Sequence, residues 1–457
     1  MDTLLTTLHR LVWGPGTLVL IMGIGLVLTA KLGVVQLRLF PHAWRQFLSS
    51  FRPGKGKGVS PFRALCTALA ATVGTGNLVG VAGAISLGGP GAIFWMWVSG
   101  FLGMAIKYAE VTLAVRYREK VPGGYAGGTM YTIRNGLGKT YYPLAWVYAL
   151  FGLLASFGVG NATQINAMVT GLNGVAAAFG REITAMGKIL LGVILAVGIG
   201  WLLWKGAGAI GALAESMVPF FSAGYILLCA GALIARAGEM PRAFGLIFQG
   251  AFSPRAVTGG MVGGALTALR VGCSRGTFTN EAGMGTAAMA HAGADVDSPS
   301  QQGLMGILEV FLDTMVICTL TALVILTSGG SIPYGTDAGV SLTEGAFAGT
   351  YGPGAGFFLA VALSCFAFAT VLGWGLYGRC CAEFLFGPRG AAAFALAQGA
   401  VVILAACTRA ETLWQASEIL NGLMALPNLI ALALLMPETI RLTREYTALL
   451  RRHPQKK

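Results

Sequence analysis

The sequence predicts an all-α polytopic membrane protein in which one N-terminal helix precedes two halves of five helices each. The first indication is composition, because 55% of the 457 residues are hydrophobic and 11% are charged, whereas soluble domains carry about 25% charged residues. The second is a series of eleven apolar segments, each near the ~20 residues that cross a bilayer as a helix. The third is a pair of polar interruptions that fall in the first segment of each half.

The segments are expected to form a single domain over residues 1–457. Within it, 11–36 is the extra N-terminal helix, 62–236 is the first half, 264–440 is the second half and 441–457 is a tail. The expected spans are 11–36, 62–87, 90–118, 143–172, 186–206, 209–236, 264–294, 299–328, 354–387, 390–408 and 412–440. Short helices at the membrane surface or over a vestibule are expected at 41–52, 240–253 and 339–352.

Lys and Arg are distributed unequally between the two sets of loops. If the N-terminus lies outside, the cytoplasmic loops and tail carry 21 of the 31 basic residues and the outer loops carry 7. Cytoplasmic loops are enriched in Lys and Arg, so we expect an inner (cell) membrane protein with its N-terminus outside and its C-terminus in the cytoplasm. Because most basic residues near the first segment follow it, we expect an uncleaved helix there. This bias also explains the net charge of +13, and no aromatic-interleaved basic patch indicates a nucleic-acid partner.

Cysteine and histidine are not arranged for metal or redox chemistry. The eight cysteines lie in or beside apolar segments and none forms a CxxC pair, which favours buried packing. The four histidines are scattered near segment ends, so a haem or metal centre is not expected. Because the sequence also has no clear nucleophile–base pattern, it does not indicate an enzyme.

The first interruption, residues 74–77, reads Gly-Thr-Gly-Asn within an apolar segment. These residue types are poor helix formers, and a helix break at membrane depth is tolerated where it lines a cavity or is buried in protein. The free amides at the start of the next half-helix would suit a carboxylate, and the carbonyls from Ala70 to Val73 would be free for a cation. The alternative is close helix packing through small residues such as Gly76 and Gly80.

The second interruption places Thr279, Asn280 and Glu281 between two apolar halves of the seventh segment. Interrupted segments at corresponding positions of two halves are typical of inverted-repeat transporters with a binding site near the bilayer midplane. Thr279 and Asn280 are expected to form a polar wall. A carboxylate inside the membrane is a functional candidate, and we expect a structural or gating role for Glu281. The alternatives are a pair with Arg270 or Arg275 and bonding to the broken backbone.

Four more polar residues lie inside expected spans. Gln164, in the fourth segment, either contacts a substrate or forms a helix-to-helix hydrogen bond. Asp313 is a second buried acid, in the eighth segment. Lys107 and Glu110 are three residues apart and are expected to form a local ion pair.

Thr370 and Trp374 lie one helical turn apart in the ninth segment. A threonine hydroxyl beside backbone carbonyls is a suitable ligand for a hard cation, and an indole one turn away could wall a small pocket. The alternative is a threonine that packs between helices and a tryptophan in the core.

Six stretches carry a resemblance to a known family: GGPGAIFWMWVSGFLG (88–103), AATVGTGN (70–77), GVGNATQ (158–164), TNEAGMG (279–285), LDT (312–314) and NGLMALPN (421–428). In them the chain resembles the sodium:alanine/glycine symporter family of the amino acid–polyamine–cation superfamily. The resemblance implies a LeuT-like 5+5 inverted-repeat core whose first and sixth helices are discontinuous, after one extra helix. It also implies symport of alanine or glycine with Na⁺ across the lipid bilayer by alternating access.

The resemblance further implies a set of site residues. The implied substrate-binding residues are Thr75, Gly76, Asn77, Gln164, Thr279, Asn280, Trp374 and Leu376. The first break would hold the substrate carboxylate and the second would receive its amino group, while Trp374 and Leu376 would limit side-chain size. Na⁺ would lie between the carbonyls of Ala70 and Val73 and the hydroxyl of Thr370.

Two departures from the family pattern leave the coupling ion and the preferred amino acid open. Ala369 stands where the family commonly has a serine beside the threonine, and GWGLYGR (373–379) stands where it commonly reads GWSYYGE. The alternatives are an H⁺-coupled transporter of the same fold, with Glu281 or Asp313 as carrier, and a substrate-gated sensor or channel. The oligomeric state is not indicated.

Overall fold

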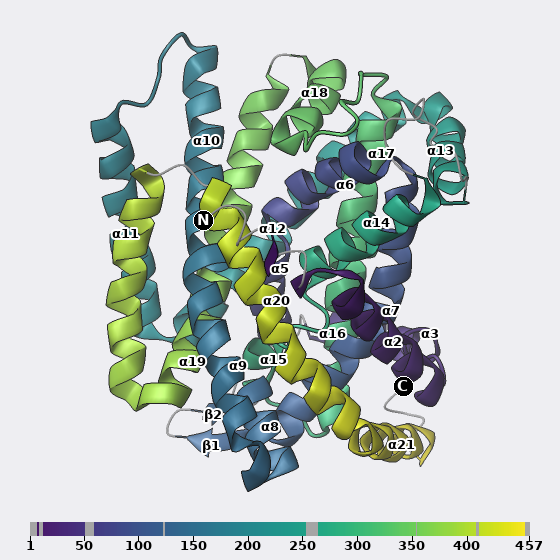
Figure 1. Cartoon of the computed structure of the whole chain (residues 1–457), viewed down its shortest axis with the longest axis vertical. Coiled ribbons are helices and arrows are strands. Elements are labelled where there is room, and N and C mark those ends of the chain that lie inside the picture. The colour runs from purple at the N-terminus through teal and green to yellow at the C-terminus, as the bar shows by residue number, and fades with distance from the viewer. Residues whose placement is uncertain are drawn as a thin grey trace.

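The computed structural model of the chain is almost entirely helical (Figure 1). The structure describes residues 7–8, 12–50, 59–121, 124–252, 264–352, 354–407 and 411–452. In these ranges, six helices are long and apolar enough to cross a bilayer, or up to eight if each of two bent helix pairs is one span. The structure therefore agrees with the polytopic class, while the count of eleven spans stays a prediction.

The N-terminal region contains α2 (Pro15–Lys31), α3 (Val35–Arg38) and α4 (Phe40–Ser49). Pro15 suits the first turn of α2, because its missing amide would have no acceptor within the helix. Past the end of α2 the chain turns through Gly33 and Val34, which have φ angles of 63° and 51°. At 17 residues, α2 is shorter than the expected span at 11–36. The helix expected near 41–52 is confirmed by α4.

The first interrupted helix opens the next series of elements. They are α5 (Pro61–Thr72), η1 (Gly76–Gly80), α6 (Val81–Gly88), α7 (Gly91–Arg116), β1 (Glu119–Val121), β2 (Gly124–Ala126), α8 (Thr129–Leu137), η2 (Lys139–Tyr141), α9 (Tyr142–Phe157), η3 (Gly158–Ala162), α10 (Thr163–Ala178), α11 (Ala185–Lys205) and α12 (Ala207–Ala235). The axis bends by 54° between α5 and the η1–α6 helix, which confirms the first interruption. The hairpin of β1 and β2, antiparallel and with Lys120 opposite Tyr125, was not predicted.

A similar series of elements contains the second interrupted helix. Its elements are η4 (Ala237–Glu239), α13 (Met240–Phe252), α14 (Ala265–Asn280), α15 (Ala287–His291), α16 (Pro299–Val310), η5 (Phe311–Cys318), α17 (Thr319–Thr327), α18 (Gly339–Tyr351), α19 (Ala355–Cys407), α20 (Glu411–Leu434) and α21 (Met436–Arg452). The gap between α14 and α15 confirms the second interruption, and α13 and α18 confirm the helices expected at 240–253 and 339–352. Gly387, at φ 70° and ψ −166°, divides α19 into two helices.

The expected last span at 412–440 extends too far. Here α20 ends at Leu434, and α21 leaves it at an angle of 61° to the helix over 418–434. Pro437 falls in the first turn of α21, where its missing amide has no acceptor to lose, so it favours the start of a new helix at this point. Residues 441–452 of the expected tail therefore belong to a helix of their own.

Two groups of helices enclose the interruptions. On one side α7 packs against α14 and α16, and on the other α19 packs against α9, α10 and α11. Figure 1 shows α10, α11 and α19 on the left and α6, α7 and α14 on the right, with α20 crossing in front. Val73, Thr75 and Glu281 are all buried, so both interruptions lie inside the molecule.

Candidate functional site

A small cavity lies where the two interruptions face each other. The volume open to water is about 20 Å³, which is room for about one water molecule. It is lined by Ala71, Thr72, Gly74, Thr75, Gly76, Val159, Gln164, Phe278, Thr279, Glu281, Thr370, Trp374 and Asn421. The structure therefore brings Thr75, Gly76, Gln164, Thr279 and Trp374 of the predicted substrate-binding set to one place, together with Thr370.

The first break begins where α5 ends at Thr72. Val73 is extended, with φ −77° and ψ 98°, and the amide of Gly74 donates to Oδ1 of Asn77 at 2.8 Å. In an uninterrupted helix this amide would donate to the carbonyl of Ala70. The asparagine side chain thus takes the place of that carbonyl as the acceptor, and the role of the carbonyls from Ala70 to Val73 as cation ligands stays a prediction.

The amide group of Asn77 does not line the cavity. Its Nδ2 donates to Oδ1 of Asp313 at 2.7 Å, and Asp313 Oδ2 accepts from Thr314 Oγ1 at 2.8 Å. Asn77 therefore connects the first break to η5, and its side chain holds the loop in shape. The structure gives it no direct contact with the cavity through that side chain.

Thr370 presents an unpaired hydroxyl to the first break. The side chain is 3% exposed, and its Oγ1 has no hydrogen-bond partner among the described residues. A Cβ added to Gly74 would lie 2.6 Å from this oxygen, and a Cβ added to Gly373 would lie 2.8 Å from the backbone nitrogen of Ala71. Two glycines thus let α19 approach the break closely, and an unpaired, buried hydroxyl oxygen fits a hard cation.

Gln164 connects the first break to α10. Thr75 Oγ1 donates to Gln164 Oε1 at 3.2 Å, and Gln164 Nε2 donates to the carbonyl of Val159 at 3.2 Å. That carbonyl lies in η3, a turn of π-helix, which is a local irregularity often found at functional sites. Gln164 therefore forms a helix-to-helix hydrogen bond and also lines the cavity, and its contact with a substrate stays a prediction.

At the second break, Glu281 takes a left-handed backbone conformation, with φ 54° and ψ 19°. Its Oε1 accepts a hydrogen bond from Trp374 Nε1 at 2.8 Å, and its Oε2 accepts one from Thr286 Oγ1 at 2.5 Å. The alternative pairing with Arg270 or Arg275 is wrong. Both carboxylate oxygens are instead used inside the protein.

Asn280 and Leu376 lie outside the cavity lining. Asn280 Nδ2 donates to Thr314 Oγ1 at 3.2 Å, and its Oδ1 accepts from the amide of Ala282 at 3.0 Å. Leu376 is two residues past Trp374 on the same helix and therefore faces another direction; it lines a different cavity, described below. Thr279 does reach the site, where its methyl group lies 3.1 Å from a Cβ placed on Gly76.

The expected Lys107–Glu110 ion pair is wrong. Lys107 Nζ lies 3.2 Å from Glu309 Oε1, with both side chains fully buried. Glu110 Oε1 instead accepts from the amides of Gly283 at 2.9 Å and Gly285 at 3.1 Å. Glu110 thus accepts from backbone amides that have no helical acceptor at the second break. The spacing of residues along α7 could not indicate this partner.

A family model described as the sodium:alanine symporter family matches residues 1–457. The chain belongs to the sodium:alanine symporter family. It is 40% identical over 453 residues to the sodium/alanine symporter AgcS of Methanococcus maripaludis, covering 97% of each chain. It is also 40% identical over 451 residues to an uncharacterized transporter of Haemophilus influenzae, covering 98% of this chain and 96% of the relative.

Among solved structures, the chain is similar to MhsT in complex with L-phenylalanine. The TM-score is 0.57 at 16% identity, covering 84% of this chain and 90% of that chain. This similarity shows a LeuT-type fold. As a member of the sodium:alanine symporter family, the chain is a multi-pass membrane transport protein and not an enzyme.

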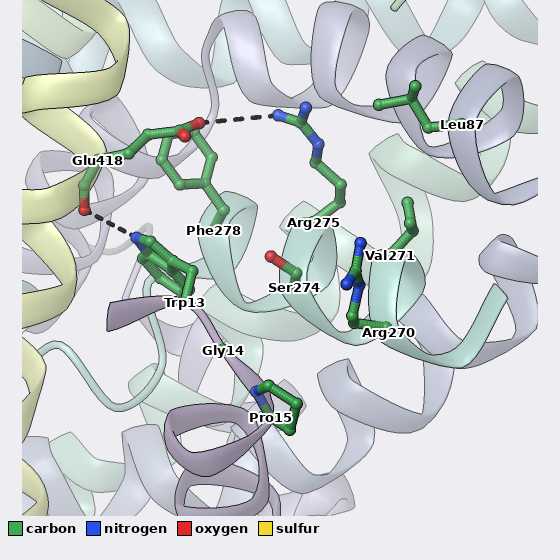
Figure 2. Close-up of a pocket in the computed structure, with 10 residues that line it drawn as sticks. All are labelled: Trp13, Gly14, Pro15, Leu87, Arg270, Val271, Ser274, Arg275, Phe278 and Glu418. Atoms are coloured by element: carbon green, nitrogen blue, oxygen red, sulfur yellow. Dashed lines mark hydrogen bonds and ion pairs between the residues drawn. The ribbon is translucent and has the colours of Figure 1, made fainter. Parts of the chain in front are cut away.

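Two larger cavities flank the central one in this symporter-family chain. The first vestibule, shown in Figure 2, has a volume of about 440 Å³ and is lined by Trp13, Gly14, Pro15, Leu87, Arg270, Val271, Ser274, Arg275, Phe278 and Glu418. The second vestibule has a volume of about 420 Å³, and its lining includes Arg63, Tyr125, Met289, Leu376 and Arg379. In the described part of the chain, the central cavity shares Phe278 with the first vestibule and no lining residue with the second.

Charged contacts cross the first vestibule beside Phe278. Arg275 lies 3.2 Å from Asp337 and 3.9 Å from Glu418, and Trp13 Nε1 donates to the backbone carbonyl of Glu418 at 2.7 Å. Figure 2 shows Glu418 connecting Arg275 on α14 to Trp13. These contacts link α14 to α20 and to the segment before α2.

Sequence reasoning did not assign several lining residues. Phe278, Val159 and Asn421 carry no signal of their own, because a phenylalanine, a valine or an asparagine in an apolar segment has many possible positions. For Asn421 the family-like NGLMALPN run was a usable signal. For Glu281 the signal was the intramembrane carboxylate itself, although its partner was not identified.

Proposed function

We propose that the chain is a secondary active symporter that carries alanine or glycine with Na⁺ by alternating access. The observation that carries this proposal is the unpaired, buried hydroxyl of Thr370, which faces the first break at Gly74. The proposal includes eleven spans, with one N-terminal helix before two inverted five-helix repeats at 62–236 and 264–434. Family membership supports amino-acid transport with sodium.

The substrate carboxylate would bind at the first break. The amides of Thr75 and Gly76 lie at the positive end of the η1–α6 half-helix, which favours an anion. Thr75 and Gln164 supply polar side chains beside them. Asn77 supports this site from behind through its bond to the amide of Gly74.

The amino group would lie at the C-terminal end of α14, near Thr279 and Asn280. The last carbonyls of a helix lack intrahelical partners and carry partial negative charge, which favours an ammonium group. Asn280 would contribute its backbone, because its side chain is bonded to Thr314 and Ala282. Trp374 would limit the side chain of the substrate. The central cavity must widen to admit an amino acid, which favours the smallest ones.

Na⁺ would be transported together with the amino acid and would bind between Ala70, Val73 and Thr370. The two backbone carbonyls and the hydroxyl are the neutral oxygen ligands that a monovalent hard cation accepts. Because the cation and the carboxylate would contact the same break, each should raise the affinity for the other by the same factor.

Transport would proceed by movement of one helix group against the other around this site. We expect an inner-membrane protein with its N-terminus outside, so that the first vestibule faces outward and the second faces the cytoplasm. The distribution of basic residues supports this orientation.

Uptake by purified protein in liposomes tests the proposal. Labelled alanine and glycine are offered with an inward Na⁺ gradient, an inward H⁺ gradient or neither. The proposal requires uptake that depends on Na⁺. Absence of uptake of both amino acids under all three conditions would contradict it.

An H⁺-coupled transporter is the second candidate, and Asp313 favours it. This acid is fully buried and forms no ion pair in the described ranges, so a proton is one way to neutralise it. Uptake that depends on an H⁺ gradient and not on Na⁺, and that is lost in Asp313→Asn, would select this candidate.

A further inference from the structure

The hydrogen bond between Trp374 and Glu281 joins two elements that are 93 residues apart in sequence. Glu281 belongs to the second break, and Trp374 belongs to the first part of α19. Both side chains are buried, at 4% and 1% exposure. The indole nitrogen is a donor only, so Glu281 is the group that satisfies it.

Glu281 is itself held in place by a second hydrogen bond of its side chain and by its backbone conformation. Thr286, at the start of α15, donates to its second carboxylate oxygen at 2.5 Å. Its backbone is left-handed, a conformation that non-glycine residues adopt at a cost and that is concentrated at functional sites. The carboxylate thus has a fixed position relative to both halves of the interrupted helix.

The indole of Trp374 is confined on its other side by backbone. A Cβ added to Gly160 in η3 would lie 2.2 Å from the Cβ of Trp374 and 2.5 Å from its Cγ. Tyr377 packs edge-on against the indole, with ring centroids 5.8 Å apart. Gly160 and Tyr377 thus pack against the ring on the sides away from its hydrogen bond, and Glu281 holds the indole nitrogen at the second break.

The Trp374–Glu281 bond lies at one end of the central cavity. Both residues line that cavity, while Leu376, two residues further along α19, and Met289, beyond Glu281 in α15, line the second vestibule. The bonded pair therefore lines the central cavity, and residues a short way along both of its helices line the second vestibule.

We infer that Glu281 is a positioning residue that fixes the Trp374 indole as the end wall of the substrate cavity and so restricts transport to amino acids with small side chains. The inference rests on the proposed amino-acid transport. Glu281 affects the size of the transported side chain only through the position of Trp374. This role requires a hydrogen-bond acceptor and not a negative charge. A glutamine can accept from the indole with its carbonyl oxygen and donate to Thr286 Oγ1 with its amide, so it keeps both bonds.

The test compares Glu281→Gln, Glu281→Leu and Trp374→Phe in liposomes that contain the full chain. Uptake of labelled glycine, alanine and leucine gives kcat/KM for each substrate, and the ratio of leucine to glycine measures the restriction on size. We expect this ratio to rise at least tenfold in Glu281→Leu and in Trp374→Phe. We expect it to stay within threefold of the wild type in Glu281→Gln. The Glu281→Leu, Trp374→Phe double variant should match Trp374→Phe alone, because Glu281 has no indole left to hold.

Two results would overturn the inference. One is an unchanged size ratio in Glu281→Leu, and the other is a Glu281→Gln variant as defective as Glu281→Leu, which would show that the charge itself binds the substrate or carries a proton. If Glu281→Leu does not fold, Thr286→Val removes one anchor of the carboxylate and should raise the ratio by a smaller factor. An unchanged ratio in folded Thr286→Val would then count against the inference.

A separate readout distinguishes failure of this inference from failure of the proposed function. If the wild type takes up no amino acid, the proposed function fails, and experimental structures of the wild type and of Glu281→Gln and Thr286→Val still report the indole. The inference expects the indole bonded to residue 281 in the wild type and in Glu281→Gln, and displaced or poorly ordered in Thr286→Val. An indole that keeps one position in all three proteins would contradict it.

Discussion

Replacing Thr370 with valine should weaken Na⁺ binding without weakening the fold. The hydroxyl has no hydrogen-bond partner among the described residues, so its removal breaks no internal hydrogen bond and leaves no donor or acceptor unpaired. Valine has nearly the same shape and fills the same space beside Gly74. The melting temperature in Na⁺-free buffer should therefore stay the same or rise.

The effect on Na⁺ affinity follows from the loss of one oxygen ligand. An interaction between a polar group and a charge contributes about 1.5–3 kcal/mol, so the dissociation constant for Na⁺ should rise by about 10- to 150-fold. A ligand at 100 times its dissociation constant stabilises a protein by about 2.7 kcal/mol, and a 30-fold loss of affinity reduces this to about 0.9 kcal/mol. Most of the Na⁺-induced rise in melting temperature should therefore disappear.

Two measurements check this prediction. The first is the Na⁺ concentration that gives half-maximal alanine uptake, and the second is the melting temperature with and without Na⁺ at constant ionic strength. Thr132→Val is the matched control, because Thr132 in α8 is also buried with an unpaired hydroxyl but does not line the central cavity. An unchanged Na⁺ dependence in Thr370→Val would refute the assignment of the cation site.

Three further predictions concern the same region. Thr75→Val and Gln164→Ala should each lower kcat/KM for alanine by about tenfold. The double variant should lose less than a hundredfold, because the two side chains share a hydrogen bond of 3.2 Å. Full additivity of the two losses in the uptake assay would contradict a shared role. Gly74→Ala should abolish Na⁺-stimulated uptake, because the added Cβ would lie 2.6 Å from the hydroxyl of Thr370. Gly80→Ala is the control: its added Cβ would lie 3.7 Å from the methyl group of Thr279, so uptake should be retained. Lys107→Met removes the cation beside the buried carboxylate of Glu309 and leaves it only the contact with His291 at 3.0 Å. This should destabilise the protein by about 3 kcal/mol, seen as a lower melting temperature in detergent. An unchanged melting temperature would show that the ion pair of 3.2 Å is dispensable.

Several features of the fold could be predicted because their signals are local. The break at residues 73–75 follows from glycine, threonine and asparagine in an apolar run, and the break at Gly387 follows from a glycine before a proline. The end of α20 was misplaced because apolar residues continue past Leu434, so hydropathy alone did not reveal the turn before Pro437.

The site was predictable only in part, because each error assigned a side chain without knowing which neighbouring helix packs against it. Lys107 was assigned to Glu110 because the two are neighbours on one helix, but helix α16 brings Glu309 to Lys107 from the other side. Asn280 was assigned to the cavity wall, but its side chain turns toward Thr314. A residue's position in the sequence limits which turn of a helix it occupies, and the neighbouring helices decide what it contacts.

The sequence by itself determined that this chain is a polytopic helical membrane protein with two interrupted helices, and its motifs indicated the family. Length, hydropathy and helix propensity are properties of contiguous residues, so these conclusions needed no tertiary contacts. Only the tertiary structure decided that Glu281 bonds to Trp374 and that Thr370 faces Gly74 with an unpaired hydroxyl. Those pairings join residues about 90 and 300 positions apart. They depend on how closely glycines allow two helices to approach, and a local sequence pattern does not contain that distance.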